Sequence, residues 1–338
     1  MNKQNLEGAH YLGQHTTLSY VIDEPRIWRR IPYLRENAGH APPLVLAVGD
    51  RRRVYAIARK LRKPVLLPET AARLSCQHAR ERKSLVAPEY GRVAMAIGLV
   101  SPSVPVLVVE TQMGASATQI IMNEILSDEL TSADYAVGKK QLNLPNKIVI
   151  RVGTAGGINC QGAPPIEVGD IVNATHSVGV TGAVIQSLLR LDFWSPGGAD
   201  ELRATWTNLG SDFTITEEGH PRVECGKDVV ETIDVAGQRI ATGAYHKGGN
   251  ITKDSLYAEL DQEMFLDLCR TQNCRSTEME LSAIAVSAHA CDAHFGMVSA
   301  IVGLLPGASF AGSMRAKAAA EHNALRVALE AADNLGSR

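Results

Sequence analysis

The stretch IVIRVGTAGG, residues 148–157, joins a run of Val and Ile to a glycine-rich segment and carries one charge, Arg151. Runs that are apolar at nearly every position are typical of strands covered on both faces. We expect this strand to end at the arginine and to run into a turn, where glycine allows close approach of the backbone and Thr154 adds a hydroxyl. A buried guanidinium needs a counter-charge. The residues leave two alternatives open, a bound phosphate or an internal ion pair.

Similar short runs rich in Val and Ile recur outward from this stretch and alternate with segments of helical period. Strands that alternate with helices indicate an α/β protein with a central sheet. The predicted strands are residues 44–48, 93–97, 106–109, 148–152, 171–174 and 297–304, and the predicted helices are residues 54–61, 116–130, 279–290 and 313–335.

The chain has 338 residues and 45% hydrophobic content, enough to bury one large core. Residues 1–43 are rich in charge and proline without a sustained period, and we interpret them as an N-terminal extension. Residues 44–338 form the predicted catalytic domain. Within it, residues 186–243 are less regular and predict an elaboration near the site or a subunit contact.

The charge balance excludes several partners. The chain has 34 Lys and Arg against 36 Asp and Glu, so it lacks the positive excess of proteins that bind nucleic acids or membrane surfaces. The longest apolar runs are far shorter than a membrane span, and the N-terminus is polar, unlike a signal sequence. We therefore predict a cytoplasmic protein without nucleic-acid or membrane partners.

The six cysteines show neither C-x-x-C spacing nor a disulfide pattern, and we interpret them as reduced thiols. His289, Asp292 and His294 surround Cys291, but the two histidines are five residues apart and would point to different faces of a helix. We therefore predict no metal site.

Two further motifs carry candidate binding residues. GDRRR, residues 49–53, follows a predicted strand and leads into a helix. Free N–H groups and the positive end of a helix dipole favour an anion there, and Arg53 adds a forked donor. TEMELS, residues 277–282, opens a helix with Glu278 and Glu280, and a buried carboxylate can accept both hydroxyls of a ribose. A solvated basic patch and an ordinary acidic helix start are the alternatives.

In this order, the motifs resemble the nucleoside phosphorylase superfamily, and its uridine phosphorylase branch in particular. The similarity runs from about residue 44 to 332 and implies a three-layer α/β/α fold around a central mixed sheet. It also implies a pentosyltransferase. The matching segments are GDRRR (49–53), ETQMGAS (110–116), RVGTAGGI (151–158), IEVGDIV (166–172) and EME (278–280).

The resemblance implies a role for each matching position. Catalysis would rest on Glu280, Arg151 and Thr154, phosphate would be held also by Gly49 and Arg53, and Met279 would contact the ribose beside Glu280. A neighbouring subunit would supply a phosphate arginine and a histidine near the ribose 5′-hydroxyl. Our candidates for these two are Arg73 and His10, with Arg80 and His15 as alternatives. The candidate base-binding residues are Ala155, Gly156, Leu256 and Gln262.

The implied reaction needs no cofactor, because inorganic phosphate is the co-substrate. Phosphate attacks the anomeric carbon while the bond to the base lengthens, and arginines hold the anion in line beside the developing oxocarbenium ion. No covalent nucleophile is required. Shared sites imply a homo-oligomer that is at least a dimer, and an ion at the subunit contact is not predicted.

The base-recognition pattern departs from both branches of the family. The glutamine and arginine that read uracil match this chain only at Gln262 after a small insertion, with Met264 in place of the arginine. Leu304 and Leu305 stand where purine-cleaving relatives carry an acid that protonates the base. We expect uridine phosphorolysis, with purine nucleoside phosphorylase as the alternative.

Three other functions compete with phosphorolysis. A hydrolytic nucleosidase would leave Arg53 and Arg151 unpaired and costly without an anion. A nicotinamide-dependent oxidoreductase requires the motif G-x-G-x-x-G, which residues 153–157 do not fit. It also requires an acidic residue at the end of the next strand, whereas Asp170 precedes its strand. A catalytically silent binding protein would not need Glu280 together with both arginines.

Overall fold

Strand β5 (Ile148–Ile158) lies at the centre of an 11-stranded mixed sheet in the computed structural model. The structure describes residues 42–67, 93–126, 147–159, 162–182, 212–254, 262–291, 293–305 and 314–338. The other strands are β1 (Leu44–Val48), β2 (Arg62–Leu67), β3 (Met95–Ser101), β4 (Val104–Glu110), β6 (Ile171–Val180), β7 (Phe213–Ile215), β8 (Pro221–Glu224), β9 (Tyr245–Lys253), β10 (Cys274–Glu278) and β11 (His294–Leu305). The helices in the described segments are α5 (Arg51–Ala58), α7 (Ala115–Leu126), α11 (Lys227–Ile240), α12 (Gln262–Thr271), α13 (Leu281–Ala290) and α14 (Met314–Gly336).

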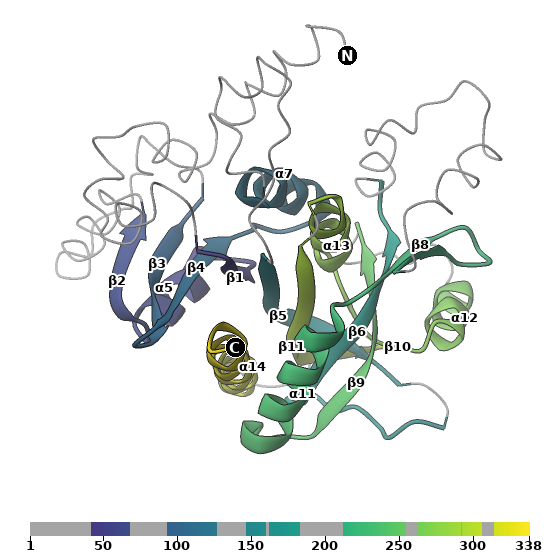
Figure 1. The fold of residues 1–338 in the computed structure, drawn as a ribbon. Coiled ribbons are helices and arrows are strands. Elements are labelled where there is room, and N and C mark those ends of the chain that lie inside the picture. The colour runs from purple at the N-terminus through teal and green to yellow at the C-terminus, as the bar shows by residue number, and fades with distance from the viewer. Residues whose placement is uncertain are drawn as a thin grey trace, which may run out of the picture.

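Part of the sheet closes on itself. Strands β4, β1, β5 and β11 run parallel as neighbours, and β11 then pairs antiparallel with β6. Strand β6 pairs with β9, β9 with β10, and β10 returns to β5 through Gly156 and Gly157. Strands β5, β11, β6, β9 and β10 therefore form a closed ring, while β1 to β4 continue from β5 as an open sheet (Figure 1).

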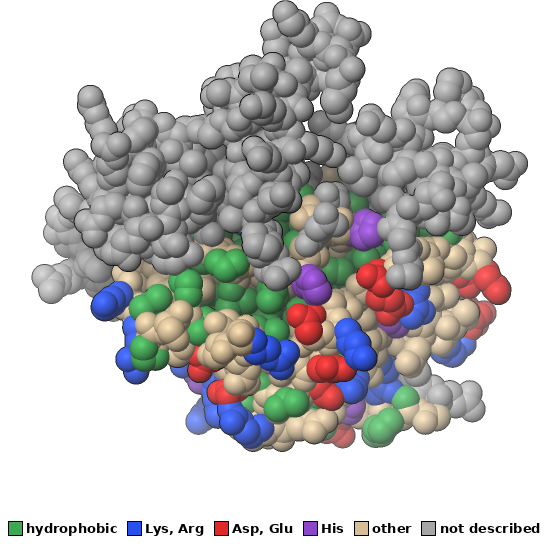
Figure 2. All heavy atoms as spheres, viewed as in Figure 1, with side chains coloured by type: hydrophobic (Ala, Val, Ile, Leu, Met, Phe, Trp, Pro, Cys, Tyr) green, Lys and Arg blue, Asp and Glu red, His purple; other side chains and the backbone are tan. Residues whose placement is uncertain are grey.

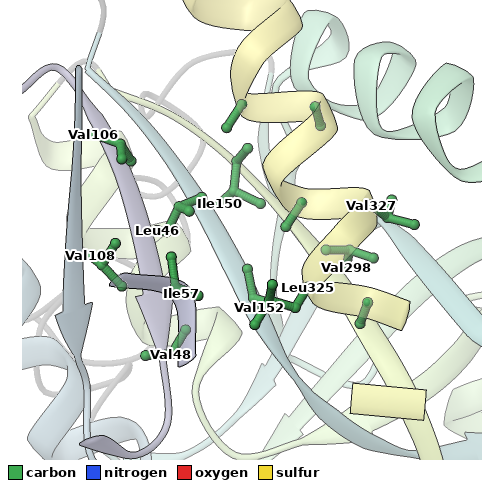
Figure 3. Packing of buried hydrophobic residues seen from close by; sticks show 14 of the residues in the cluster. Leu46, Val48, Ile57, Val106, Val108, Ile150, Val152, Val298, Leu325 and Val327 are labelled. Carbon is green, nitrogen blue, oxygen red and sulfur yellow. The ribbon is translucent and has the colours of Figure 1, made fainter. Parts of the chain in front are cut away.

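Helices cover both faces of the sheet, because successive side chains of each strand point to opposite sides. On β1, Val45 and Ala47 belong to the core that includes α7 and α13. Leu46 and Val48 belong to a second core with α5, α11 and α14, shown in Figure 3. The predicted three-layer α/β/α fold with a central mixed sheet is confirmed.

The glycine-rich part of β5 is a strand, and the predicted turn after Arg151 is wrong. The strand continues through Gly156 and Gly157, which pair with β10 on one side and β11 on the other. A Cβ atom on residue 157 would lie 2.7 Å from Ile166 Cγ2 and 3.0 Å from Ile301 Cγ2. Glycine is therefore needed at this position for close packing of neighbouring segments.

Each predicted strand overlaps an observed one. Two of the predicted helices begin and end within a few residues of α5 and α13, and the Ser313 start expected for the last helix lies outside the described residues. The segment predicted to be irregular contains α11, on which Val229, Ile233 and Ala236 are buried at helical spacing. Its other described part, residues 212–226, includes the hairpin of β7 and β8.

The described surface agrees with the charge balance of the sequence. Figure 2 shows Lys and Arg side chains interspersed with Asp and Glu over the described part of one face. None of the helices in the described segments combines the length and apolar character that crossing a bilayer would require.

We expect Ile150→Ala to lower the free energy of unfolding by about 2 to 5 kcal/mol, because it empties a fully buried position under α14. Ile120→Ala on α7 is the matched control, since Ile120 is 44% exposed, and its effect should stay within about 0.5 kcal/mol. Urea unfolding of both variants measures the difference. Equal effects would contradict the assigned core.

Candidate active site

Arg151 lies within β5 and is 2% exposed. Its Nη2 donates to Glu280 Oε2 at 2.6 Å, and its Nε lies 3.8 Å from Glu278 Oε2. The internal ion pair that the sequence left open is therefore present. Arg151 Nε and Nη1 make no hydrogen bond with any described residue, so donors remain for another partner.

Glu280 connects the buried arginine to the start of a helix. It lies immediately before α13, and its Oε1 accepts from the backbone N–H of Gly114 at 2.9 Å. Gly114 precedes α7 and has a φ of 93°, a conformation that favours glycine. The carboxylate thus lies at the positive end of the α7 dipole. The 110–116 motif and the 278–280 motif meet at this contact.

Glu278 is held from several sides. Its Oε1 accepts from Asn250 Nδ2 at 2.9 Å and from Thr252 Oγ1 at 2.8 Å, both on β9. Its Oε2 accepts from the backbone N–H of Glu280 at 2.8 Å, and the N–H of Leu281 donates to both oxygens. Glu278 therefore satisfies free N–H groups at the start of α13 and fixes the backbone that carries Glu280.

The two carboxyl groups differ in acidity. Burial, together with the neighbouring Glu280 carboxylate, raises the pKa of Glu278 to about 7, although Arg151 acts against this. Burial would also raise the pKa of Glu280, but the Arg151 guanidinium and the Gly114 amide outweigh it and hold that pKa below its ordinary value. Glu280 is therefore the more acidic member of the pair and loses its proton at the lower pH.

The second arginine follows β1. Asp50 caps α5, because its Oδ1 accepts from the backbone N–H of Arg52 at 2.9 Å and of Arg53 at 3.2 Å. Arg53 Nη2 donates to Glu321 Oε1 on α14 at 3.0 Å, and Arg53 Nε lies 3.5 Å from Asp50 Oδ2. Each arginine thus has carboxylate partners within the chain. The expectation that both would be unpaired without an anion is wrong.

The two guanidinium groups converge on Gly49. A Cβ atom on residue 49 would lie 3.4 Å from Arg53 Nη1 and 3.5 Å from Arg151 Nη1 and Nη2. Gly153, on the same strand as Arg151, lies against the Arg151 guanidinium. A Cβ atom on residue 153 would lie 3.2 Å from Arg151 Cζ. The residues predicted to form two phosphate loops therefore surround one small space.

The other predicted site residues fall into four groups. Thr154 and Gly156 on β5 and Met279 before α13 are half-buried beside this cluster. Ala155 is buried in an apolar group with Ile166 and Ile301. Gln262 is exposed as the first residue of α12. Arg73, His10 and Leu256, with the alternatives Arg80 and His15, lie outside the described residues.

The cluster lies at the carboxyl edge of the parallel strands. Val48, Glu110 and Val152 are neighbours in register on β1, β4 and β5, and the chain leaves β1 and β4 just beyond them. Crevices beyond the carboxyl ends of strands are where open α/β sheets bind ligands. Two forked cations with free donors at this edge suit a small anion such as phosphate, and the adjoining carboxylate suits a polyol.

Sequence reasoning did not assign five contributors to this cluster. Gly114 and Glu278 stood inside quoted motifs, and the buried-carboxylate pattern of EME could have indicated both glutamates. Asn250, Thr252 and Glu321 belong to distant segments, and their positions depend on strand pairing and helix packing. Among the described residues, no group of three or more His, Cys, Asp or Glu is placed to hold a metal ion.

Comparisons with known proteins agree with this fold and identify a family. A family model described as "Phosphorylase superfamily" matches residues 68–333, which begins after Gly49 and Arg53. Purine nucleoside phosphorylase from Toxoplasma gondii matches with a TM-score of 0.56 and 18% identity over 88% of this chain and 92% of that one. Uridine phosphorylase from Vibrio fischeri matches with a TM-score of 0.57 and 16% identity over 88% and 93%. A search of curated proteins finds no match.

We expect Gly49→Ala to fold normally, because its Cβ would make ordinary contacts and φ lies outside the left-handed region. The added methyl group would occupy the space between the two guanidinium groups. Affinity for inorganic phosphate should therefore fall on the order of tenfold to a hundredfold. Phosphate titration monitored by ³¹P NMR measures this, with thermal unfolding as the check on folding. Undiminished affinity would mean that the anion binds elsewhere.

The raised pKa of Glu278 predicts a pH-dependent stability. Between its ordinary value of 4.5 and about 7, the folded state holds a proton that the unfolded state has released. Stability should therefore fall as pH rises through this interval, by at most ~1.4 kcal/mol per unit. Glu280 acts oppositely, since its lowered pKa gives stability that is present above 4.5 and lost as pH falls through its folded pKa.

The Glu278→Gln variant should lack the decline between pH 5 and 7, because Gln does not titrate. Urea unfolding of the wild type and the variant at pH 5, 6, 7 and 8 gives the difference in slope, in which the contributions of groups that do not interact with Glu278 cancel. Parallel curves would show that Glu278 is already ionised at pH 5.

Proposed function

Since this chain belongs to the phosphorylase superfamily, whose model matches residues 68–333, we propose that it is a nucleoside phosphorylase. It converts uridine and inorganic phosphate to uracil and ribose 1-phosphate. The observation that carries this proposal is the convergence of Arg53 and Arg151 on Gly49, with Glu280 bonded to Arg151. The proposed phosphate site and the proposed ribose site are then joined by the ion pair of Arg151 and Glu280.

The residues divide the work on the two substrates. Arg151 keeps Nη2 on Glu280 and Nε beside Glu278, and it offers Nη1 to phosphate, while Arg53 adds its own Nη1. Thr154 adds a hydroxyl on the same strand. The remaining lone pairs of Glu280 accept the ribose 2′- and 3′-hydroxyls, and Met279 contacts the sugar. Phosphate is thereby placed against the anomeric carbon without any change in the ion pair.

In the reaction, a phosphate oxygen forms a bond to C1′ while the bond from C1′ to the base nitrogen breaks. The electron pair of that bond leaves with the base, and the proton that hydrogen phosphate loses on becoming the sugar ester is taken up by the base, through solvent, to give uracil. Positive charge develops on the sugar ring and is stabilised by the adjacent phosphate and by Glu280. Orientation of two bound substrates supplies much of the remaining acceleration.

Uridine is preferred to purine nucleosides because the end of β11 carries no acid. Leu304 packs with Ala155 and Ile301, and Leu305 Cδ1 lies 3.9 Å from the Cβ position of residue 156. An apolar wall beside Gly156 offers no proton to purine N7. Residues 306–313 contain no acidic side chain either.

Hydrolysis of the nucleoside is the second candidate, and one observation favours it. Arg53 and Arg151 are balanced by Asp50, Glu321 and Glu280 within the chain, so neither arginine requires a bound phosphate for its stability. The donors that remain on both groups still favour phosphate as the attacking species.

The proposed enzyme works in the cytoplasm as a homo-oligomer with shared sites. Arg73 and His10 are the residues that we propose for the contribution of a neighbouring subunit to phosphate and to the ribose 5′-hydroxyl. Both positions come from the family resemblance alone.

Phosphate-dependent base release across uridine, thymidine, inosine and adenosine tests the proposal. We expect release from uridine that saturates with phosphate and yields ribose 1-phosphate. Glu280→Ala should lower kcat/KM by about 10²- to 10³-fold, because a contact that stabilises the developing charge is lost.

The Glu280→Gln variant is measured as well, in case the Ala variant unfolds. Gln keeps an oxygen that can accept a hydrogen bond from Gly114 or Arg151. Release that is independent of phosphate would identify a nucleosidase, and release from inosine alone a purine enzyme. Full activity in both Glu280 variants would refute the ribose role.

A further inference from the structure

We propose that Glu321 on α14 is a positioning residue for phosphate, which holds the Arg53 guanidinium so that its free donor faces Gly49. The inference rests on the proposed function, because it assigns Arg53 to the co-substrate. Glu321 lies 268 residues away from Arg53 in the sequence, and neither the motifs nor the family resemblance identified it.

The contacts of Arg53 define one occupied edge and one free donor. Glu321 Oε1 accepts from Nη2 at 3.0 Å, and Asp50 Oδ2 lies 3.5 Å from Nε. Both nitrogens belong to the same side of the planar group. The remaining nitrogen, Nη1, lies 3.4 Å from the Cβ position of Gly49 and makes no hydrogen bond to a residue that the structure describes.

Of the two carboxylates that contact Arg53, Glu321 is the one with no second role in the described structure. Asp50 caps α5 through Oδ1 and lies 36% exposed, whereas the Glu321 side chain makes its hydrogen bond to Arg53 alone within the described segments. The Arg53 side chain is 18% and that of Glu321 29% exposed, so the pair is less screened by solvent than one on the open surface.

The backbone that carries Glu321 is fixed by the core. Ala320, Ala324 and Ala328 of α14 are buried in the same cluster as Leu46 of β1 and Ile57 of α5. The carboxylate therefore starts from a helix that is packed against both elements flanking Gly49. A long arginine side chain loses rotamer freedom when it is tethered in this way, so less entropy is lost when phosphate binds.

Removal of Glu321 has two opposing effects on anion binding. Loss of the acceptor frees the Arg53 side chain and should weaken phosphate binding, whereas loss of the negative charge should strengthen it. Gln keeps an oxygen that can accept from Nη2 and removes the charge. Comparison of Glu321→Ala with Glu321→Gln therefore separates positioning from electrostatic repulsion.

The experiment measures steady-state kinetics and phosphate binding for the wild type, Glu321→Ala and Glu321→Gln. We expect Glu321→Ala to raise the KM for phosphate about five- to tenfold, with the KM for uridine and kcat within about twofold of wild type. Glu321→Gln should return the phosphate KM to within about twofold of wild type.

Glu330→Ala is the matched control. Glu330 lies on the same helix, is 28% exposed and pairs with an arginine, Arg239 of α11, away from Gly49. It should leave the phosphate KM unchanged. An equal rise in Glu330→Ala, a fall in kcat without a change in phosphate KM, or an unchanged phosphate KM in Glu321→Ala would overturn the inference.

Phosphate titration by ³¹P NMR separates this inference from the proposed function. If the wild type binds phosphate but does not cleave uridine, the proposed function fails and the ratio of the two dissociation constants still decides the role of Glu321. If the wild type binds no inorganic phosphate, both are overturned.

Discussion

The site depends on a buried guanidinium and the carboxylate that balances it. Arg151 is almost inaccessible, and a charge in that position is tolerated only with a close partner. Glu280 supplies that partner at 2.6 Å and is in turn fixed by the Gly114 amide. Loss of either member would leave an unpaired charge in the core. The contact that organises the site is therefore also needed for the stability of the fold.

The closed ring of strands brings this pair together. Strand β5 carries Arg151, and its glycines let β10 and β11 pair with it on opposite sides. Strand β10 ends at Glu278, and the chain turns directly into α13 with Glu280 at its start. Two residues of β9 then fix Glu278 from the side. The proposed ribose end of the site is thus built on paired strands and a helix start, which allow less motion than a loop.

The anion end is built differently, because its two cations come from a strand and from the helix that follows the neighbouring strand. Arg151 belongs to the ring, whereas Arg53 belongs to the helix after β1 and is held by α14. Each guanidinium uses some nitrogens for internal carboxylates and keeps others for the space at Gly49. The internal carboxylates lower the positive potential of this space, so directed hydrogen bonds would contribute more than net charge to the binding of the proposed phosphate.

The sequence by itself determined the class of fold and the strands around β1 and β5, and it predicted the two arginines and the glutamate of the proposed site. These follow from local signals, since runs of Val and Ile, glycines and charges at strand ends act through neighbouring residues. It did not determine that residues 153–157 continue as a strand, because only contacts with β10, β11 and Ile166 show why glycine is required there. The tertiary structure alone decided which carboxylate meets which arginine, since Glu280, Gly114 and Glu321 reach their partners across more than a hundred residues.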